Sequence, residues 1–164
     1  MVFMMDELLA LRRGMVVFEV GTGSGYHAAT IAEVVAPTGE DPTEWGHVYT
    51  AEIIPSLARW AWKNLKKTGY SDRVSVLAHD GSAGLPLRIR PDRILITAAA
   101  PKPPEPLLEQ LKVGGRMVLP VGEPTWWGGQ VLAVIDKEEE GEYKTTAITE
   151  VAFVPLRGKY GWPG

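Results

Sequence analysis

Residues 16–26 read Val-Val-Phe-Glu-Val-Gly-Thr-Gly-Ser-Gly-Tyr, and this stretch decides the fold of the chain. An apolar run ends in three glycines at alternate positions, and a helix-compatible segment, residues 27–35, follows directly. Glycine tolerates positive φ and lets the backbone approach a ligand closely, while a helix N-terminus presents unpaired N–H groups. The stretch therefore predicts a strand, a tight turn and a helix start that together bind a nucleoside.

The spacing of the glycines discriminates between cofactors. A dinucleotide-binding turn has the form G-x-G-x-x-G, which would place its third glycine at position 26, whereas this chain has Gly25. The form E-x-G-x-G-x-G, from Glu19 to Gly25, is typical of S-adenosylmethionine (AdoMet) methyltransferases, whose ligand has no pyrophosphate. The predicted cofactor is therefore AdoMet, with S-adenosylhomocysteine as its product.

Length and composition narrow the possible classes of protein. A chain of 164 residues is expected to form a single domain, residues 1–164. A net charge of −3 without any basic run argues against a nucleic-acid partner. The chain has no cysteine and three widely spaced histidines, so no metal site is expected. No apolar run approaches the roughly 20 residues that cross a bilayer, and no signal peptide is seen, so no membrane partner and a cytoplasmic location are expected.

Strand and helix signals alternate along most of the chain, which predicts an α/β fold with a parallel sheet and helices on both faces. The expected strands are residues 15–20, 47–53, 73–78, 93–97 and 116–121. The expected helices are residues 4–11, 26–35, a segment from Pro55 to a stop at Gly69, and 104–111. The last third changes character: residues 131–136 and 145–154 are strand-like and flank an acidic turn, residues 137–142. We therefore predict an open, mostly parallel, Rossmann-like sheet with a C-terminal antiparallel hairpin, the layout of class I AdoMet methyltransferases.

Candidate binding residues follow successive strands. In an open α/β sheet, ligands bind outside the carboxyl ends of the strands. Glu52 is placed to accept hydrogen bonds from ribose hydroxyls, Asp80 to accept one from an adenine amino group, and the small residues from Thr97 leave room for the reacting methyl group. The predicted cofactor-binding set is Glu19, Gly21, Thr22, Gly23, Ser24, Gly25, Glu52, Ile53, Asp80, Gly81, Thr97 and Ala98.

Each of these residues also has a purely structural interpretation. Glu52 could favour the positive end of the helix that starts at Pro55, and Asp80-Gly81 is an ordinary turn pair. Glu19 could be a buried carboxylate satisfied by local N–H groups. The shared position of these residues at one edge of the predicted sheet favours the binding interpretation.

Segments along the whole chain resemble protein-L-isoaspartate O-methyltransferases, in the order that this family has. Two of them, Ala98-Ala99-Ala100-Pro101 and Val154-Pro155-Leu156, are not general methyltransferase features. The matching segments are residues 19–26, 52–55, 80–82, 92–94 with 97–101, 106–111, 114–122 and 153–158.

The resemblance implies repair of damaged protein. The family transfers a methyl group from AdoMet to the α-carboxylate of an L-isoaspartyl residue, and the ester then cyclises to a succinimide that reopens partly to aspartate. An isoaspartyl protein or peptide is therefore the implied partner; a monomer is preferred, although the sequence leaves the oligomeric state open. A carboxylate with a pKa near ~4 is already ionised at neutral pH, so the reaction mainly requires positioning in a site that excludes water.

The resemblance also has a gap, because the family continues upstream of the segment that matches Met1. The upstream part carries a Ser/Thr-x-Ser-x-Pro-His loop that covers the cofactor and helps to bind the substrate carboxylate, so no catalytic residue is assigned here. Weak or absent repair activity is expected of the chain as given. Two alternatives stay open: a methyltransferase of another substrate class, such as RNA or a small molecule, and a lidless form that binds AdoMet with little or no catalysis. Trp126-Trp127 is a candidate surface for a partner, or part of the rim on which the upstream lid would rest.

Overall fold

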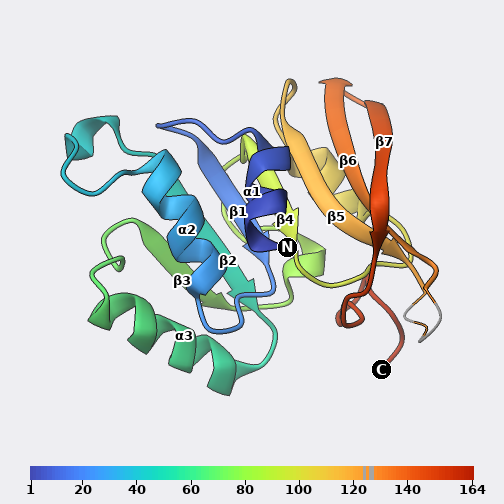
Figure 1. Cartoon of the computed structure of the whole chain (residues 1–164), viewed down its shortest axis with the longest axis horizontal. Helices are drawn as coiled ribbons and strands as arrows, with labels where there is room; N and C mark the ends of the chain where they lie inside the picture. The colour runs from blue at the N-terminus through green and yellow to red at the C-terminus, as the bar shows by residue number, and fades with distance from the viewer. Residues whose placement is uncertain (124, 126–127) are drawn as a thin grey trace.

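The computed structural model describes residues 1–123, 125 and 128–164; the candidate surface at Trp126-Trp127 lies outside the described residues. Seven strands form one sheet. They are β1 (Val16–Val20), β2 (His47–Glu52), β3 (Val74–Ala78), β4 (Arg93–Ile96), β5 (Arg116–Gly122), β6 (Gln130–Glu139) and β7 (Glu142–Val151). Their order is β3-β2-β1-β4-β5-β6-β7 (Figure 1). The first five strands pair in parallel, and β6 and β7 pair antiparallel, which confirms the predicted sheet and hairpin.

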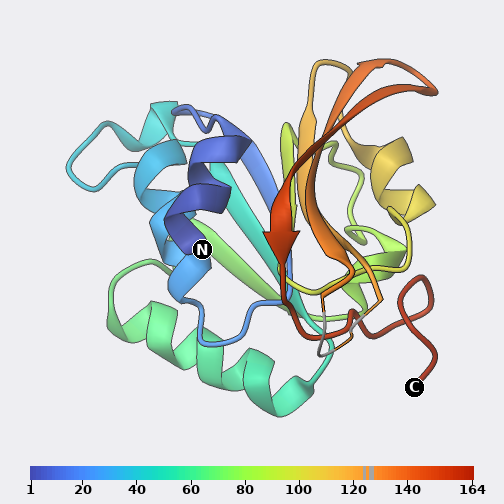
Figure 2. The same cartoon turned by 45° about the vertical axis from the view of Figure 1, so that its right-hand side comes forward.

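Helices cover both faces of the sheet (Figure 2). Alternate residues of each strand point to opposite faces, so Val17 packs into one core and Phe18 into the other. The Val17 core takes side chains from α1 (Val2–Leu9), α2 (Tyr26–Val35) and α3 (Pro55–Lys67). The Phe18 core takes side chains from α4 (Glu105–Gln110). Near-continuous apolar strands are what a sheet buried on both faces requires.

The order of the strands fixes where a ligand binds. The chain leaves β1 for β2 on one side of the sheet and later returns to β4 on the other side. The crossover direction therefore reverses between β1 and β4, and a crevice opens at the carboxyl ends of these strands. Two short 3-10 helices lie in the connections, η1 (Pro42–Glu44) and η2 (Gly81–Ala83), and η2 follows β3 at this same end.

The predicted acidic turn at residues 137–142 is wrong at both ends. Strands β6 and β7 extend to Glu139 and from Glu142, so that only the two residues between them turn. Lys137 is 1% exposed, and its ammonium donates to the carbonyls of Leu108, Glu109 and Leu111 at 3.0, 3.1 and 2.8 Å. A cation satisfies the unpaired carbonyls at the end of α4, which explains why a lysine is buried here.

None of the helices in the described part of the chain is long and apolar enough to cross a membrane.

Candidate functional site

A cavity of about 340 Å³ opens at the carboxyl ends of the parallel strands, and we call it the strand-end cavity. Its walls come from the loop after β1, the end of β2, η2, the residues after β4 and a segment near the C-terminus. The predicted residues that line it are Gly21, Gly23, Glu52, Ile53, Gly81, Thr97 and Ala98. The structure thus brings together seven residues from four separate segments of the chain.

The glycine-rich loop forms the floor of this cavity. Gly21 has a φ of +100°, which favours glycine, and its carbonyl accepts a hydrogen bond of 2.9 Å from the Thr97 hydroxyl. A Cβ at Gly21 would lie 2.5 Å from Thr97 Oγ1, so no side chain fits between the two loops. Close packing of this kind leaves backbone atoms, rather than side chains, to face a ligand.

Glu52 presents a fixed carboxylate to the cavity. The residue is 8% exposed, its Oε2 accepts from the Gly23 amide at 3.1 Å, and its Oε1 accepts from the Ile54 amide at 3.3 Å. Each carboxylate oxygen has about two acceptor positions, so one position on each oxygen remains for a ligand. A pair of neighbouring acceptors suits the two vicinal hydroxyls of a ribose.

Asp80 does not line the strand-end cavity, although Gly81 beside it does. Asp80 Oδ1 accepts from the amide and the hydroxyl of Ser82 at 3.0 and 2.7 Å, and Oδ2 accepts from the Lys159 amide at 2.8 Å. The carboxylate therefore fastens the C-terminal segment to η2. The suggested adenine contact of Asp80 stays a prediction that this arrangement does not favour.

Residues 154–157 form a wall of the cavity that the predicted set did not include. The Ala99 amide donates to the Val154 carbonyl at 2.8 Å, and the Leu156 amide donates to the Ala99 carbonyl at 2.9 Å, so the segment pairs with the chain after β4. Pro155 and Arg157 also line the cavity. The sequence did contain a signal for this wall, the Val-Pro-Leu run that resembles the family. An apolar run after the last strand is expected to pack against another part of the protein.

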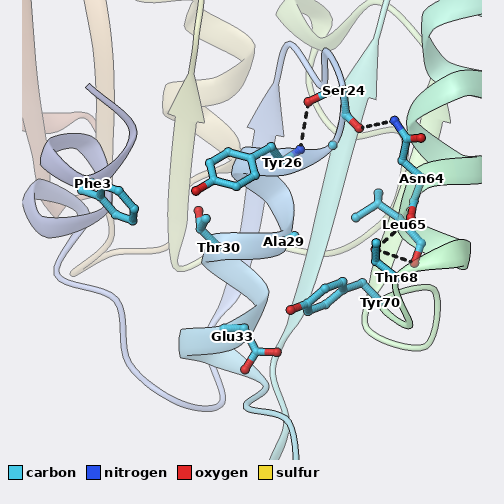
Figure 3. Close-up of a pocket in the computed structure, with 11 residues that line it drawn as sticks. Phe3, Ser24, Tyr26, Ala29, Thr30, Glu33, Asn64, Leu65, Thr68 and Tyr70 are labelled. Carbon is cyan, nitrogen blue, oxygen red and sulfur yellow. Dashed lines mark hydrogen bonds between the residues drawn. The ribbon is translucent and has the colours of Figure 1, made fainter.

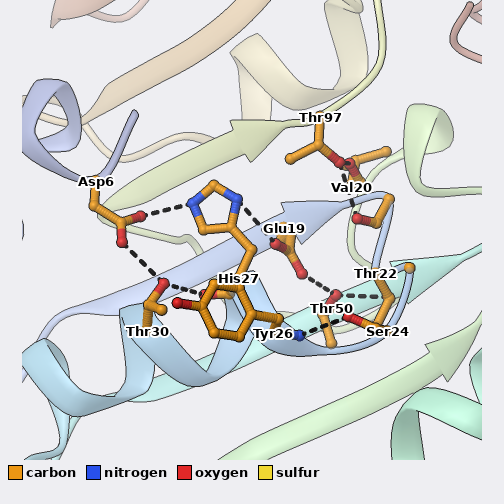
Figure 4. A network of polar contacts seen from close by, with 12 residues as sticks. Asp6, Glu19, Val20, Thr22, Ser24, Tyr26, His27, Thr30, Thr50 and Thr97 are labelled. Carbon is orange, nitrogen blue, oxygen red and sulfur yellow. Dashed lines mark hydrogen bonds and ion pairs between the residues drawn. The ribbon is translucent and has the colours of Figure 1, made fainter. Parts of the chain in front are cut away.

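Glu19 lies behind the glycine-rich loop in a buried polar network (Figure 4). Its Oε1 accepts from the Thr50 hydroxyl at 2.6 Å, and the Thr22 and Thr50 hydroxyls are 2.6 Å apart. Glu19 Oε2 lies 3.9 Å from His27 Nδ1 and is a buried side-chain oxygen without a hydrogen bond. Burial raises the pKa of Glu19 to about 7, against the lowering effect of nearby His27.

The same network joins two helices, α1 and α2, and two strands, β1 and β2. His27 Nε2 lies 2.7 Å from Asp6 Oδ1, and the Thr30 hydroxyl donates to Asp6 Oδ2 at 2.9 Å, so α1 is held against the start of α2. Glu19 and Thr22 consequently support the loop from behind rather than line the strand-end cavity.

A second hollow, of about 580 Å³, lies between α2 and α3, and Figure 3 shows the side chains that surround it. Ser24 and Gly25 line this hollow instead of the strand-end cavity, and Asn64 donates to the Ser24 carbonyl at 3.0 Å. Its walls are mainly apolar, and Glu33 is its one described carboxylate. The strand-end cavity, which holds Glu52 at the crossover point, is therefore the better candidate for a nucleoside site.

Within residues 1–123, 125 and 128–164, no group of three or more histidine, aspartate or glutamate side chains is placed to hold a metal ion.

Comparison with known proteins places the chain in a family. Residues 1–161 match the family model described as protein-L-isoaspartate(D-aspartate) O-methyltransferase. A protein-L-isoaspartate O-methyltransferase of Korarchaeum cryptofilum is 58% identical over 99% of this chain and 72% of its own length. One from Hyperthermus butylicus is 52% identical over 99% of this chain and 66% of its own length. The chain thus spans about two thirds of the length of these relatives.

Solved structures agree on the fold. A protein-L-isoaspartate O-methyltransferase superposes with a TM-score of 0.84 at 27% identity, over 98% of this chain and 47% of that one. A beta-aspartate methyltransferase from Plasmodium falciparum, solved in complex with S-adenosyl-L-homocysteine, has a TM-score of 0.76 at 21% identity, over 95% of this chain and 71% of that one. The fold, the motifs and the extent of these matches agree: the chain belongs to the protein-L-isoaspartate (D-aspartate) O-methyltransferase family, whose members are AdoMet-dependent methyltransferases.

Proposed function

We propose that the chain methylates the carboxylate of isoaspartyl residues in proteins, with AdoMet held in the strand-end cavity. Family membership supports the reaction, and methyltransferases of this family use AdoMet. The single observation that carries the placement of the cofactor is Glu52, a nearly buried carboxylate with free acceptor positions at the crossover point of the sheet. Its two backbone hydrogen bonds hold the carboxylate in place and leave one acceptor position on each oxygen for the ribose hydroxyls.

The residues around the cavity fit the parts of AdoMet. Glu52 would hold the ribose, and the backbone of Gly21 and Gly23 would face the amino-acid part of the ligand without interference from side chains. Apolar walls from Ile53 and Leu156 suit the flat faces of an adenine ring. Three residues of the predicted cofactor-binding set, Glu19, Thr22 and Asp80, would act indirectly by fixing the loops that contact the ligand.

Bound AdoMet supplies a methyl group on a sulfonium centre, which needs no further activation. The substrate carboxylate needs no activation either, because it is already ionised at neutral pH. The protein therefore has to orient the two reactants and exclude water. Arg157 is the one basic residue among the described residues that line the strand-end cavity, and its guanidinium also donates to the Pro163 carbonyl at 3.5 Å. We assign Arg157 the task of orienting the incoming carboxylate, because guanidinium groups bind carboxylates in a fixed geometry.

Calorimetry with AdoMet and S-adenosylhomocysteine tests the cofactor site. The Glu52→Gln variant should bind both ligands about 10- to 100-fold more weakly, because a hydrogen bond to a charged group contributes about 1.5–3 kcal/mol. Glu7→Gln, an exposed change of the same chemistry on α1, is the matched control and should bind normally. Equal affinities in Glu52→Gln and Glu7→Gln would place the ribose elsewhere.

Methyl transfer to a short isoaspartyl peptide, with the matching aspartyl peptide as control, tests the reaction itself. Transfer to the isoaspartyl peptide alone is the expected result, and Arg157→Gln should raise KM for the peptide more than it changes the affinity for AdoMet. Methylation of both peptides at the same rate would contradict the proposed substrate.

A further inference from the structure

The outer surface of α3 is positively charged, in contrast to the rest of the chain. This cationic face consists of two tryptophans and four basic residues, all of them exposed: Arg59, Trp60, Trp62, Lys63, Lys66 and Lys67. No acidic residue occurs between Glu52 and Asp72, whereas the whole chain has 20 acidic and 17 basic residues. The inner side of the helix packs on the sheet through Ala58, Ala61 and Leu65, so the charged side is left to solvent.

Helix stability explains only some of these charges. Arg59 and Lys63 are four positions apart, as are Lys63 and Lys67, and like charges at this spacing repel each other on a helix surface. Among the described residues, none of the four basic side chains forms an ion pair. Lys66 and Lys67 lie in the last turn, where the helix dipole favours cations, but this explanation does not reach Arg59 and Lys63. Their placement points to an anionic partner outside the molecule.

The two tryptophans have the exposure that an interface would cover. Trp60 is 50% exposed and Trp62 is 45% exposed, and Lys66 lies 5.0 Å from the centre of the Trp62 ring. Arg59 and Trp62 also border a hollow of about 260 Å³ between α3 and the edge strand β3. Tryptophan and arginine beside a pocket are the residue types that dominate binding energy at protein interfaces.

The cationic face begins next to the strand-end cavity. Ile53 and Ile54 directly precede α3, Leu57 lies in its first turn, and all three line that cavity. From there the 13-residue helix extends for about 20 Å. A polypeptide whose carboxylate enters the cavity over this part of its rim would have α3 within reach.

We propose that the cationic face of α3 binds an acidic segment of the substrate polypeptide beside the isoaspartyl residue. The inference rests on the proposed function, since that function makes the ligand of the neighbouring cavity a protein. An acidic segment complements the four unpaired cations, and its backbone and side chains can cover the two tryptophans. The face thus gives the enzyme a preference for damaged sites in acidic surroundings.

Two fluorescently labelled isoaspartyl peptides test this preference, one with four glutamates after the damaged residue and one with four glutamines. Fluorescence anisotropy at low salt should give at least 10-fold tighter binding of the glutamate peptide, and the difference should shrink in 0.5 M NaCl. In the double variant Arg59→Gln/Lys63→Gln the two peptides should bind within about 2-fold of each other. The control Arg88→Gln/Lys144→Gln removes the same charge from exposed positions outside α3 and should keep the preference.

Equal binding of the two peptides by the unaltered protein would overturn the proposal, as would a preference that survives in Arg59→Gln/Lys63→Gln. Tighter binding of a single-stranded oligonucleotide, or of phosphatidylserine vesicles, than of the glutamate peptide would also overturn it. The anisotropy assay needs no catalysis, so a failure of the proposed function is distinguishable. A failure of the proposed function would appear in two separate measurements: calorimetry would show no AdoMet binding, or the transfer assay would show no methylation of the glutamine peptide.

Discussion

Replacement of Glu19 by glutamine should make the protein more stable at alkaline pH. The pKa of Glu19 is about 7 in the folded protein, raised mainly by burial from its ordinary value of 4.5. The folded state therefore holds a proton on Glu19 at pH values where the unfolded state has lost it. The stabilisation from this group is complete below about pH 4.5 and is lost as the pH rises through about 7.

The magnitude follows from the two pKa values. A difference between 4.5 and about 7 corresponds to about 3 kcal/mol in the free energy of unfolding, at roughly 1.4 kcal/mol per pH unit. A glutamine is neutral at every pH, and its oxygen can still accept from the Thr50 hydroxyl while its amide faces His27. We expect the extra stability of the variant to be smallest near pH 5, at the acidic end of the range, and to reach up to about 3 kcal/mol near pH 8.5.

Chemical denaturation of both proteins from pH 5 to pH 9 measures this difference. The other charged groups that face Glu19, namely Asp6, His27 and Glu52, are present in both proteins, so the difference between the two curves isolates the replaced carboxyl and its coupling to them. Glu7→Gln on the exposed side of α1 is the control and should give a difference that does not change with pH. A constant offset between Glu19→Gln and the unaltered protein across this range would refute the reasoning.

Three further substitutions have defined outcomes. Gly21→Ala should reduce AdoMet affinity in calorimetry by at least about 10-fold, because the new Cβ would meet Thr97 Oγ1 at 2.5 Å and the φ of +100° is strained for alanine; normal affinity would show that the loop adapts freely. Lys137→Met should lower the free energy of unfolding by about 2–4 kcal/mol, since three carbonyls at the end of α4 lose their donor; an unchanged denaturation midpoint would mean that water replaces the ammonium. Asp80→Ala should release the C-terminal segment at Lys159 and increase its proteolysis by trypsin; cleavage at the original rate would show that the other contacts of the segment suffice.

Local patterns predicted the central part of the fold well. The predicted helix at residues 26–35 has the observed bounds of α2, because Gly25 adopts positive φ immediately before it. Predicted helix ends elsewhere were displaced: the helix expected at residues 4–11 spans Val2–Leu9, since Ala10 takes a left-handed conformation and ends it. The residue at which a helix ends depends on tertiary contacts, and helix propensity alone does not predict it.

The errors and omissions concern contacts between distant parts of the chain. Lys137 appeared to belong to an acidic turn because its partners, the carbonyls at the end of α4, are almost 30 residues away. The adenine contact of Asp80 stays a prediction, but its contact with Lys159 was missed because the two residues are 79 positions apart. Glu52 and Gly21 were placed correctly at the cavity since strand order alone brings them there. Sequence patterns therefore located the edge of the sheet at which the strand-end cavity opens, but not which side chains turn toward each other.

The wall built by residues 154–157 has a consequence for the newly made protein. The five parallel strands and the glycine-rich loop leave the ribosome before this segment does, since synthesis runs from the N-terminus. A nascent chain that stops at β7 has Glu52 in place and still lacks the enclosure that residues 154–157 provide. The AdoMet site that we propose is thus enclosed only after residues 154–157 have been made.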